Sequence, residues 1–139
     1  RLAELTSASV WGERRDALVR ANAGRAAELG LHGATMLLAI DWAVNPATHL
    51  VIVEGKDDAG SEIANEMHHL ALRSYCPRRV IHRVRVGDAA EVSLPAAVRG
   101  VLASATGTRG FLCTGMSCEA PATSVEAWHA TLGHLARQR

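Results

Sequence analysis

The spacing of hydrophobic and polar residues changes near residue 45, and this change divides the chain into two parts. In residues 11–29, Ala, Leu and Arg predominate and recur at three- and four-residue steps, which predicts a helix that ends at Gly30. A second helix is predicted from about residue 33 to residue 44, where the run ATMLLAIDWAV is apolar on several faces. One partner helix cannot cover so wide an apolar surface, so we expect further helices to pack against this hairpin.

After Pro46 the pattern becomes one of strands alternating with helices. The run HLVIV at residues 49–53 is rich in β-branched side chains and is followed closely by Gly55, which is typical of a buried strand. Residues 61–75 carry an apolar stripe at helical spacing, with acidic capping residues just before it. This helix is predicted to end before Pro77.

Two more strands and a last helix are predicted farther along. In RRVIHRVRV, residues 78–86, Val84 and Val86 alternate with arginines, which indicates a half-exposed strand at the edge of a sheet. A loop from residue 87 leads to the short strand FLC at residues 111–113. Residues 124–137 are predicted to close the chain as a helix.

Together these elements predict an α/β fold. Strands that alternate with helices imply parallel strands joined by right-handed crossovers. We therefore expect a helical hairpin in residues 1–45, followed by a small, mainly parallel sheet with helices in residues 46–139.

Length, charge and cysteine content limit the possible functions. The 139 residues fit one domain and are too few for a complete toroid or α/β barrel. The formal net charge is only +1, and no apolar run approaches the roughly 20 residues that span a bilayer, so we expect neither nucleic-acid binding nor membrane insertion. Three cysteines fit a reducing cytoplasm better than a disulfide-stapled secreted scaffold. Because the chain starts at Arg1 and not at Met, we expect residues to precede it.

The most distinctive short pattern is FLCTGMSCEAP, in which four residues separate Cys113 from Cys118. Three alternatives remain open for this thiol pair: buried thiols with a structural role, a local disulfide across a turn that Gly115 would favour, or a zinc site. With His129 and His134 the pair approaches zinc-finger spacing, but residues five apart on a helix lie about 140° apart and do not share a face. We therefore expect no metal and no cofactor. A structural role is favoured over catalytic redox work, because thioredoxin-like pairs have two intervening residues at a helix start.

A second candidate site is a ligand loop at the carboxyl ends of the predicted strands, formed by Gly55, Asp57, Gly60 and Gly110. The segment VIVEGKDDAG follows a strand and opens a helix, which is where glycine-rich loops bind phosphates. It lacks the G-x-G-x-x-G pattern, and Asp57 with Asp58 would repel a phosphate. A strand-to-helix turn with acidic capping is therefore the favoured interpretation.

Three segments together resemble the C-terminal region of a known family. This family is the spermatogenesis-associated, thioredoxin-domain-containing protein family. The segments that resemble it, in chain order, are LLAIDWAV, HLVIVEGKDD and FLCTGMSCEAPATSVEAW. In that family, an N-terminal domain that resembles thioredoxin is joined to an α/α toroid of the epimerase and six-hairpin glycosidase type. They end with a strand resembling IVIVG, a helix, and a tyrosine-valine-cysteine strand that carries C-x4-C before a proline. Here the two strands read VIVEG, with Glu54 before the glycine, and Phe111-Leu112-Cys113, and both keep strand character.

The resemblance implies that this chain is the non-catalytic C-terminal segment of such a protein. Residues 1–45 would be the last hairpin of the toroid, and residues 46–139 a structural cap. The implied partners are the toroid and the thioredoxin-like domain upstream in the same chain, and we expect the isolated segment to self-associate. For the parent protein the resemblance implies carbohydrate or thiol-redox chemistry, and whether it is an enzyme stays open. The alternatives are an autonomous α/β ligand-binding module, or a thiol or zinc site at Cys113 and Cys118.

Overall fold

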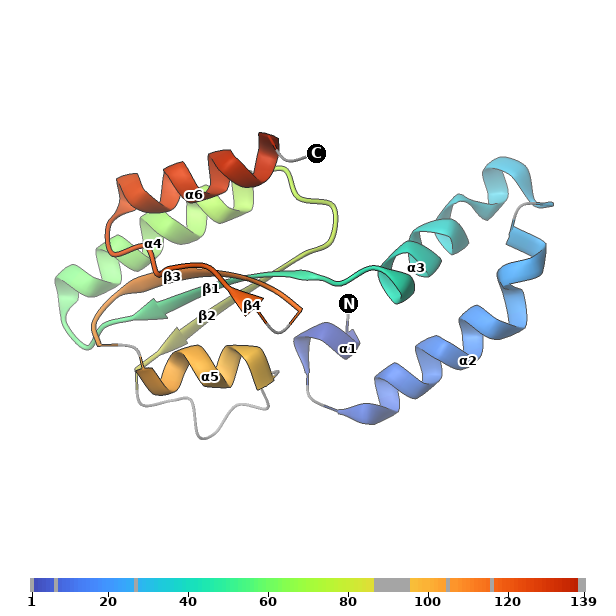
Figure 1. Ribbon diagram of the computed structural model, residues 1–139, viewed down its shortest axis with the longest axis horizontal. Helices are drawn as coiled ribbons and strands as arrows, with labels where there is room; N and C mark the ends of the chain where they lie inside the picture. The colour runs from blue at the N-terminus through green and yellow to red at the C-terminus, as the bar shows by residue number, and fades with distance from the viewer. Residues whose placement is uncertain are drawn as a thin grey trace.

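The computed structural model describes residues 2–6, 8–26, 28–86, 96–104, 106–115 and 117–137. The helices are α1 (Leu2–Leu5), α2 (Ser9–Ala26), the 3-10 helix η1 (Gly30–Gly33), α3 (Ala34–Val44), α4 (Asp58–Arg73), α5 (Ala96–Ser104) and α6 (Val125–Arg137), and the strands are β1 (Thr48–Glu54), β2 (Arg79–Arg85), β3 (Arg109–Thr114) and β4 (Ser117–Cys118). Figure 1 shows their arrangement. All the predicted helices and strands are present, whereas α1, η1, α5 and β4 were not predicted. The loop predicted from residue 87 lies outside the described residues up to residue 95.

The four strands form one mixed sheet in the order β2-β1-β3-β4. β1 and β2 are parallel and are joined through α4, as predicted, but β3 runs antiparallel to β1, and β4 runs antiparallel to β3. The α/β class and the N-terminal helical hairpin are therefore confirmed, whereas the expectation of a mainly parallel sheet is wrong. The physical reason is the return path of the chain. Arg109, the first residue of β3, pairs with Val53 near the end of β1. β3 therefore begins at the end of the sheet where β1 finishes and runs back along β1.

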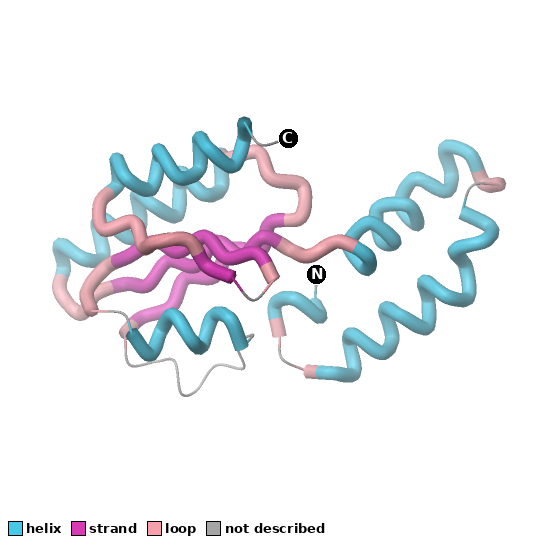
Figure 2. The backbone as a smooth tube through the Cα atoms, viewed as in Figure 1, coloured by secondary structure: helices cyan, strands magenta, loops and turns pink. Residues whose placement is uncertain are grey.

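The two faces of the sheet are covered by different helices, with α4 and α6 on one face and α5 on the other (Figure 2). Every residue of β1 is buried, which explains the nearly unbroken apolar run of that strand. β2 lies at the edge of the sheet, and its buried and more exposed side chains alternate as its sequence predicts.

Trp128 of α6 is the largest fully buried side chain and anchors the core between the sheet, α4 and α6. Its indole Nε1 donates a hydrogen bond of 3.0 Å to the carbonyl oxygen of Met67 on α4. Its ring lies against Gly110, where a Cβ atom would be only 2.7 Å from the ring atom Cε3. Gly110 therefore provides the space that lets the tryptophan reach the sheet.

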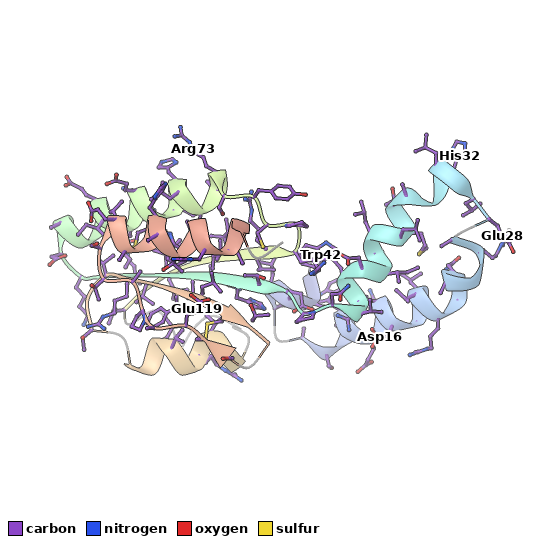
Figure 3. The ribbon with its side chains drawn as sticks, turned by 45° about the horizontal axis from the view of Figure 1, so that its top comes forward. Asp16, Glu28, His32, Trp42, Arg73 and Glu119 are labelled. Carbon is purple, nitrogen blue, oxygen red and sulfur yellow. A yellow bond between two sulfur atoms is a disulfide. The ribbon has the colours of Figure 1, made fainter. Side chains whose placement is uncertain are left out.

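The helices α2 and α3 form a hairpin that projects away from the sheet (Figure 1). Two polar contacts fasten the base of this hairpin: Arg78 donates to both carboxylate oxygens of Asp41 at 3.0 Å, and Glu4 pairs with Arg15 at 3.2 Å. Trp42 lies at the end of α3 near the sheet, whereas His32 lies at the distant tip (Figure 3).

The helix α3 buries none of its eleven residues. Leu37, Leu38 and Val44 are 50%, 63% and 69% exposed, although the helix is almost entirely apolar. The apolar surface that the sequence predicts on this hairpin is thus largely open to solvent. Within the described part of the chain, no helix is long and apolar enough to cross a membrane.

Candidate functional site

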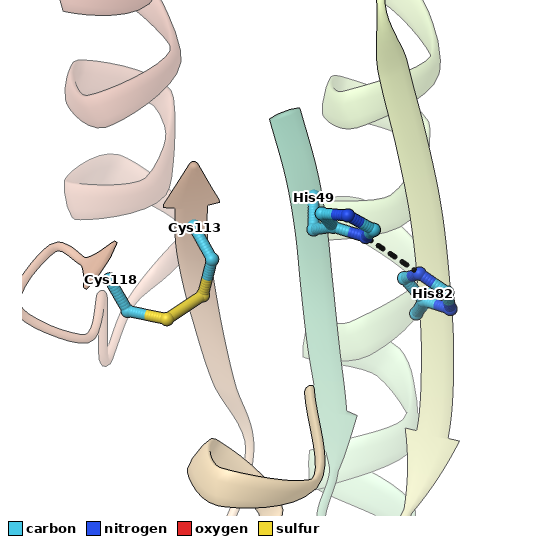
Figure 4. The surroundings of a disulfide bond; sticks show 4 residues. All are labelled: His49, His82, Cys113 and Cys118. Carbon is cyan, nitrogen blue, oxygen red and sulfur yellow. Dashed lines mark hydrogen bonds between the residues drawn. A yellow bond between two sulfur atoms is a disulfide. The ribbon is translucent and has the colours of Figure 1, made fainter. Parts of the chain in front are cut away.

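The two cysteines of the C-x4-C pattern are joined as a disulfide between β3 and β4 (Figure 4). Cys113 and Cys118 are register partners in this antiparallel pair, and their Cα atoms lie 4.0 Å apart. Of the three alternatives that the sequence left open, the structure shows the local disulfide. The third cysteine, Cys76, is buried and not in a disulfide.

The turn between the two strands explains why the pair can form. Thr114 and Ser117 are the last register partners before the turn, and Gly115 has a φ of 61°, which side-chain-bearing residues rarely adopt. A glycine at this position allows the chain to reverse within two residues. The sequence prediction that Gly115 favours such a turn agrees with this geometry.

Two histidines lie on the same face of the sheet as the disulfide. His49 on β1 is the register partner of Cys113, and His82 lies on β2, where it pairs with Val51. Partners across a ladder project to the same face, and Val51 and Cys113 belong to one buried cluster, so all three side chains share that face. Figure 4 shows the two imidazoles turned toward each other, on the side of His49 away from Cys118.

The imidazoles form a close buried pair. Nδ1 of His49 and Nε2 of His82 are 3.1 Å apart, the rings are stacked with centroids 5.4 Å apart, and each residue is only 6% exposed. Nε2 of His49 also lies 3.9 Å from a carboxylate oxygen of Glu4 on α1. The pair therefore links the two parallel strands to the N-terminal helix.

Burial makes both imidazoles weak bases. It lowers the pKa of His49, an effect that the Glu4 carboxylate opposes. Burial, together with the charge of a protonated His49, lowers the pKa of His82 to about 4. Both rings are then neutral near pH 7, and one ring donates its N–H to the nitrogen of the other. Such a pair can accept protons when the solution becomes acidic.

The disulfide, the histidine pair and the helix histidines do not assemble into a metal site. His129 and His134 are exposed on α6, which covers the opposite face of the sheet from Cys113. Among the described residues, no group of three or more His, Cys, Asp or Glu side chains could hold a metal ion. The C-x4-C-x10-H-x4-H spacing is therefore not a spatial cluster.

The structure brings three of the four predicted loop residues together and fastens them to one another. Asp57 caps α4 by accepting a hydrogen bond of 2.7 Å from the backbone N–H of Gly60, and the N–H of Gly55 donates to Thr108 Oγ1 at 2.9 Å. The Thr108 hydroxyl in turn donates to the carbonyl oxygen of Gly60 at 3.0 Å. Gly110, by contrast, serves the packing of Trp128. Both glycine N–H groups that could have held a phosphate are thus engaged within the loop.

A pocket of about 360 Å³ lies beside this loop, and its lining carries charges of both signs. Glu54 at the end of β1 is 3% exposed and pairs with Arg83 at 2.7 Å and Arg85 at 2.9 Å. Burial alone would raise the pKa of Glu54, but the hydrogen bonds from Arg85 and Arg83 outweigh it, so the pKa is lowered. Glu54 is an ionised carboxylate that neutralises the arginines of the edge strand.

The histidine pair was not found by reasoning from the sequence, although part of its signal was present. His49 and His82 each sit at the phase of their strand that carries buried valines. Their pairing depends on the register between β1 and β2, which the sequence pattern does not state. The disulfide could be named as one of three alternatives because its two cysteines are close together in the sequence.

Comparison with family models, with curated proteins and with solved structures found no match to this chain.

Proposed function

We propose that this chain is a structural, non-catalytic segment whose helical hairpin completes a larger α/α toroid and whose α/β part caps it. The proposal joins the resemblance to the thioredoxin-domain-containing family with the fold described above. The hairpin of α2 and α3 supplies a unit of the kind from which such toroids are built, and the small mixed sheet follows directly.

The observation that carries the proposal is the exposure of α3. A helix that is apolar on most faces is normally buried, yet this one has no buried residue. Leu37, Leu38 and Val44 would each contribute about 1–3 kcal/mol if a neighbouring helix covered them. Open apolar surface of this kind is typical of an interaction site.

An autonomous α/β ligand-binding module has less support. Its expected ligand loop at Gly55, Asp57 and Gly60 is closed by internal hydrogen bonds, and its pocket offers mixed charges. For the parent protein we retain carbohydrate or thiol-redox chemistry as the class that the resemblance implies.

We place the protein in the cytoplasm, which its few cysteines support. Disulfides in that compartment are usually transient and not structural. The Cys113–Cys118 bond is compatible with this location only if it is reversible.

The experiment compares the free chain with variants on α3. The purified chain is expected to bind a hydrophobic dye and to self-associate in light scattering. Replacing Leu37 and Leu38 with Gln should reduce both signals while changing the free energy of unfolding by no more than about 0.5 kcal/mol, because both side chains are exposed. Leu72→Gln on α4 is the matched control, since Leu72 is 48% exposed but lies outside the hairpin, and it should leave both signals unchanged.

A second arm tests the occupant of this surface. Production of the chain together with the helical region that we propose to precede it should abolish dye binding and give one defined species. A wild-type chain that stays monomeric and dye-negative at high concentration would show that the hairpin needs no partner, and the proposal would then fail.

A further inference from the structure

We propose that the Cys113–Cys118 disulfide is a thiol–disulfide exchange site at which an external dithiol attacks the sulfur of Cys118. This activity is independent of the capping role. It is supported by the different exposure of the two cysteines and of their neighbours in β4. It is also supported by the backbone hydrogen bonds that hold the segment after β4 against β3.

The two cysteines differ sharply in exposure. Cys113 is completely buried in the cluster that includes Val51 and Phe111, whereas Cys118 is only half-buried at the margin of that cluster. The flanking Ser117 and Glu119 are exposed. Because an attacking thiolate must approach in line with the bond that breaks, a bond that runs outward from Cys113 to Cys118 presents Cys118 to the solvent.

Backbone hydrogen bonds also hold the strands around the disulfide together. Gly110 and Ala122 exchange two backbone hydrogen bonds, of 2.9 and 2.8 Å, and the N–H of Glu119 donates to the carbonyl oxygen of Leu112 at 2.9 Å. These bonds hold the segment after Cys118 against β3 whether or not the sulfurs are joined. The two cysteines are only five positions apart, and a disulfide that closes so short a loop restricts the unfolded chain least. A purely stabilising role therefore explains this bond poorly.

The exchange proceeds in two balanced steps. A thiolate of the external dithiol attacks Sγ of Cys118, a new S–S bond forms between them, and the Cys113–Cys118 bond breaks with its electron pair leaving on Sγ of Cys113. The proton lost by the attacking thiol is taken up by Cys113, because an unpaired thiolate in an apolar core is costly. The second thiol of the dithiol then attacks the mixed disulfide, which releases Cys118 as a thiol and the reductant as its own disulfide. Two electrons pass from the dithiol to the protein.

The test follows the thiols of the folded chain. All proteins carry Cys76→Ala, so that the buried Cys76 thiol, which is not in the disulfide, does not react. Dithiothreitol is added without denaturant, samples are quenched by alkylation, and the thiols that appear are counted by mass, while circular dichroism follows the fold. We expect both sulfurs to become reduced while the circular dichroism signal stays native. Reduction that requires denaturant would overturn the proposal.

The position of attack is tested with single-cysteine variants and glutathione disulfide. Cys113→Ser leaves the half-buried Cys118, which should form a mixed disulfide about tenfold or more faster than the buried Cys113 left by Cys118→Ser. Equal rates, or a faster Cys113, would refute attack at Cys118. If either variant does not fold, the oxidised chain with its native disulfide is incubated with reduced glutathione, and peptide mapping decides which cysteine carries the glutathione.

A last experiment separates the two sources of dithiol. A thioredoxin-type protein is added in catalytic amount to the dithiothreitol reaction. A faster reduction indicates a protein dithiol, and an unchanged rate indicates a small one.

Discussion

Mild acid should destabilise this chain through its buried histidine pair. His49 and His82 are neutral in the folded protein, with their nitrogens 3.1 Å apart, whereas in the unfolded chain each is free to bind a proton near its ordinary pKa. Because burial lowers both folded-state pKa values, the unfolded state binds more protons than the folded state below pH 6.5. The stabilisation is therefore fully present above pH 6.5 and is lost as the pH falls toward the folded-state values.

The size of the effect follows from His82. Its pKa falls from 6.5 to about 4 in the folded chain, and one pKa unit corresponds to about 1.4 kcal/mol, so the free energy of unfolding should fall by about 2 kcal/mol between pH 6.5 and pH 5 and by about 3 kcal/mol by pH 4. Among the described residues, the Glu4 carboxylate on α1 lies 3.9 Å from Nε2 of His49 and partly offsets the effect of burial on that ring. The pKa of Glu54 is lowered from 4.5, so that carboxylate loses its own stabilisation mainly below pH 5 and adds little to the change between pH 6.5 and pH 5.

Urea unfolding followed by tryptophan fluorescence at pH 7.5, 6.0 and 5.0 measures this loss. His82→Gln keeps a polar partner for His49 but does not titrate, so its stability should depend much less on pH over the same range. His129→Gln removes an exposed histidine on α6 and should keep the wild-type dependence. The reasoning would be refuted by a wild-type chain whose stability changes by less than about 0.5 kcal/mol between pH 7.5 and 5.0, or by a His82→Gln variant with an unchanged slope.

Two further predictions concern packing. Ile52→Ala removes a fully buried side chain of β1 and should lower the free energy of unfolding by about 2–5 kcal/mol in urea titration, whereas Leu18→Ala at a 62% exposed position should change it by less than about 1 kcal/mol. Gly110→Ala places a Cβ atom 2.7 Å from the Trp128 ring and should cost about 1–3 kcal/mol in thermal melting, while Gly100→Ala, which meets nothing within 4 Å on α5, should be neutral or stabilising by up to about 1 kcal/mol. Loss at Gly100 equal to that at Gly110 would contradict the packing role of Trp128.

The sequence predicted best those elements whose signals are local. The run HLVIV marked β1 because both faces of that strand are covered, and all of its residues are buried. The alternation in β2 likewise reported its place at the sheet edge. The direction of β3, however, depends on which end of the sheet the chain reaches before Arg109. That is a property of the whole path, and no local pattern encodes it.

The helix α5 was missed although part of its signal was readable. Val98, Val101 and Leu102 follow helical spacing and pack against the face of the sheet that carries Val51. A loop from residue 87 to the strand FLC was predicted across this stripe, so its helical spacing was overlooked. In the candidate site, too, the local feature was identified and the non-local one was not. The two cysteines are close in the sequence, whereas the histidine pair forms only through the register between β1 and β2.

The order of the strands limits how copies of this chain can join. One edge of the sheet is β2, where Arg83 and Arg85 are exposed and already bound to Glu54, and the other edge is β4, which is only two residues long. Charged or very short edge strands prevent further strands from adding. Among the described strands, neither edge thus favours the addition of a second copy, and association is directed to the open helices. A concentrated solution of this chain should therefore contain assemblies joined through the exposed helical surface and without cross-β strand pairing.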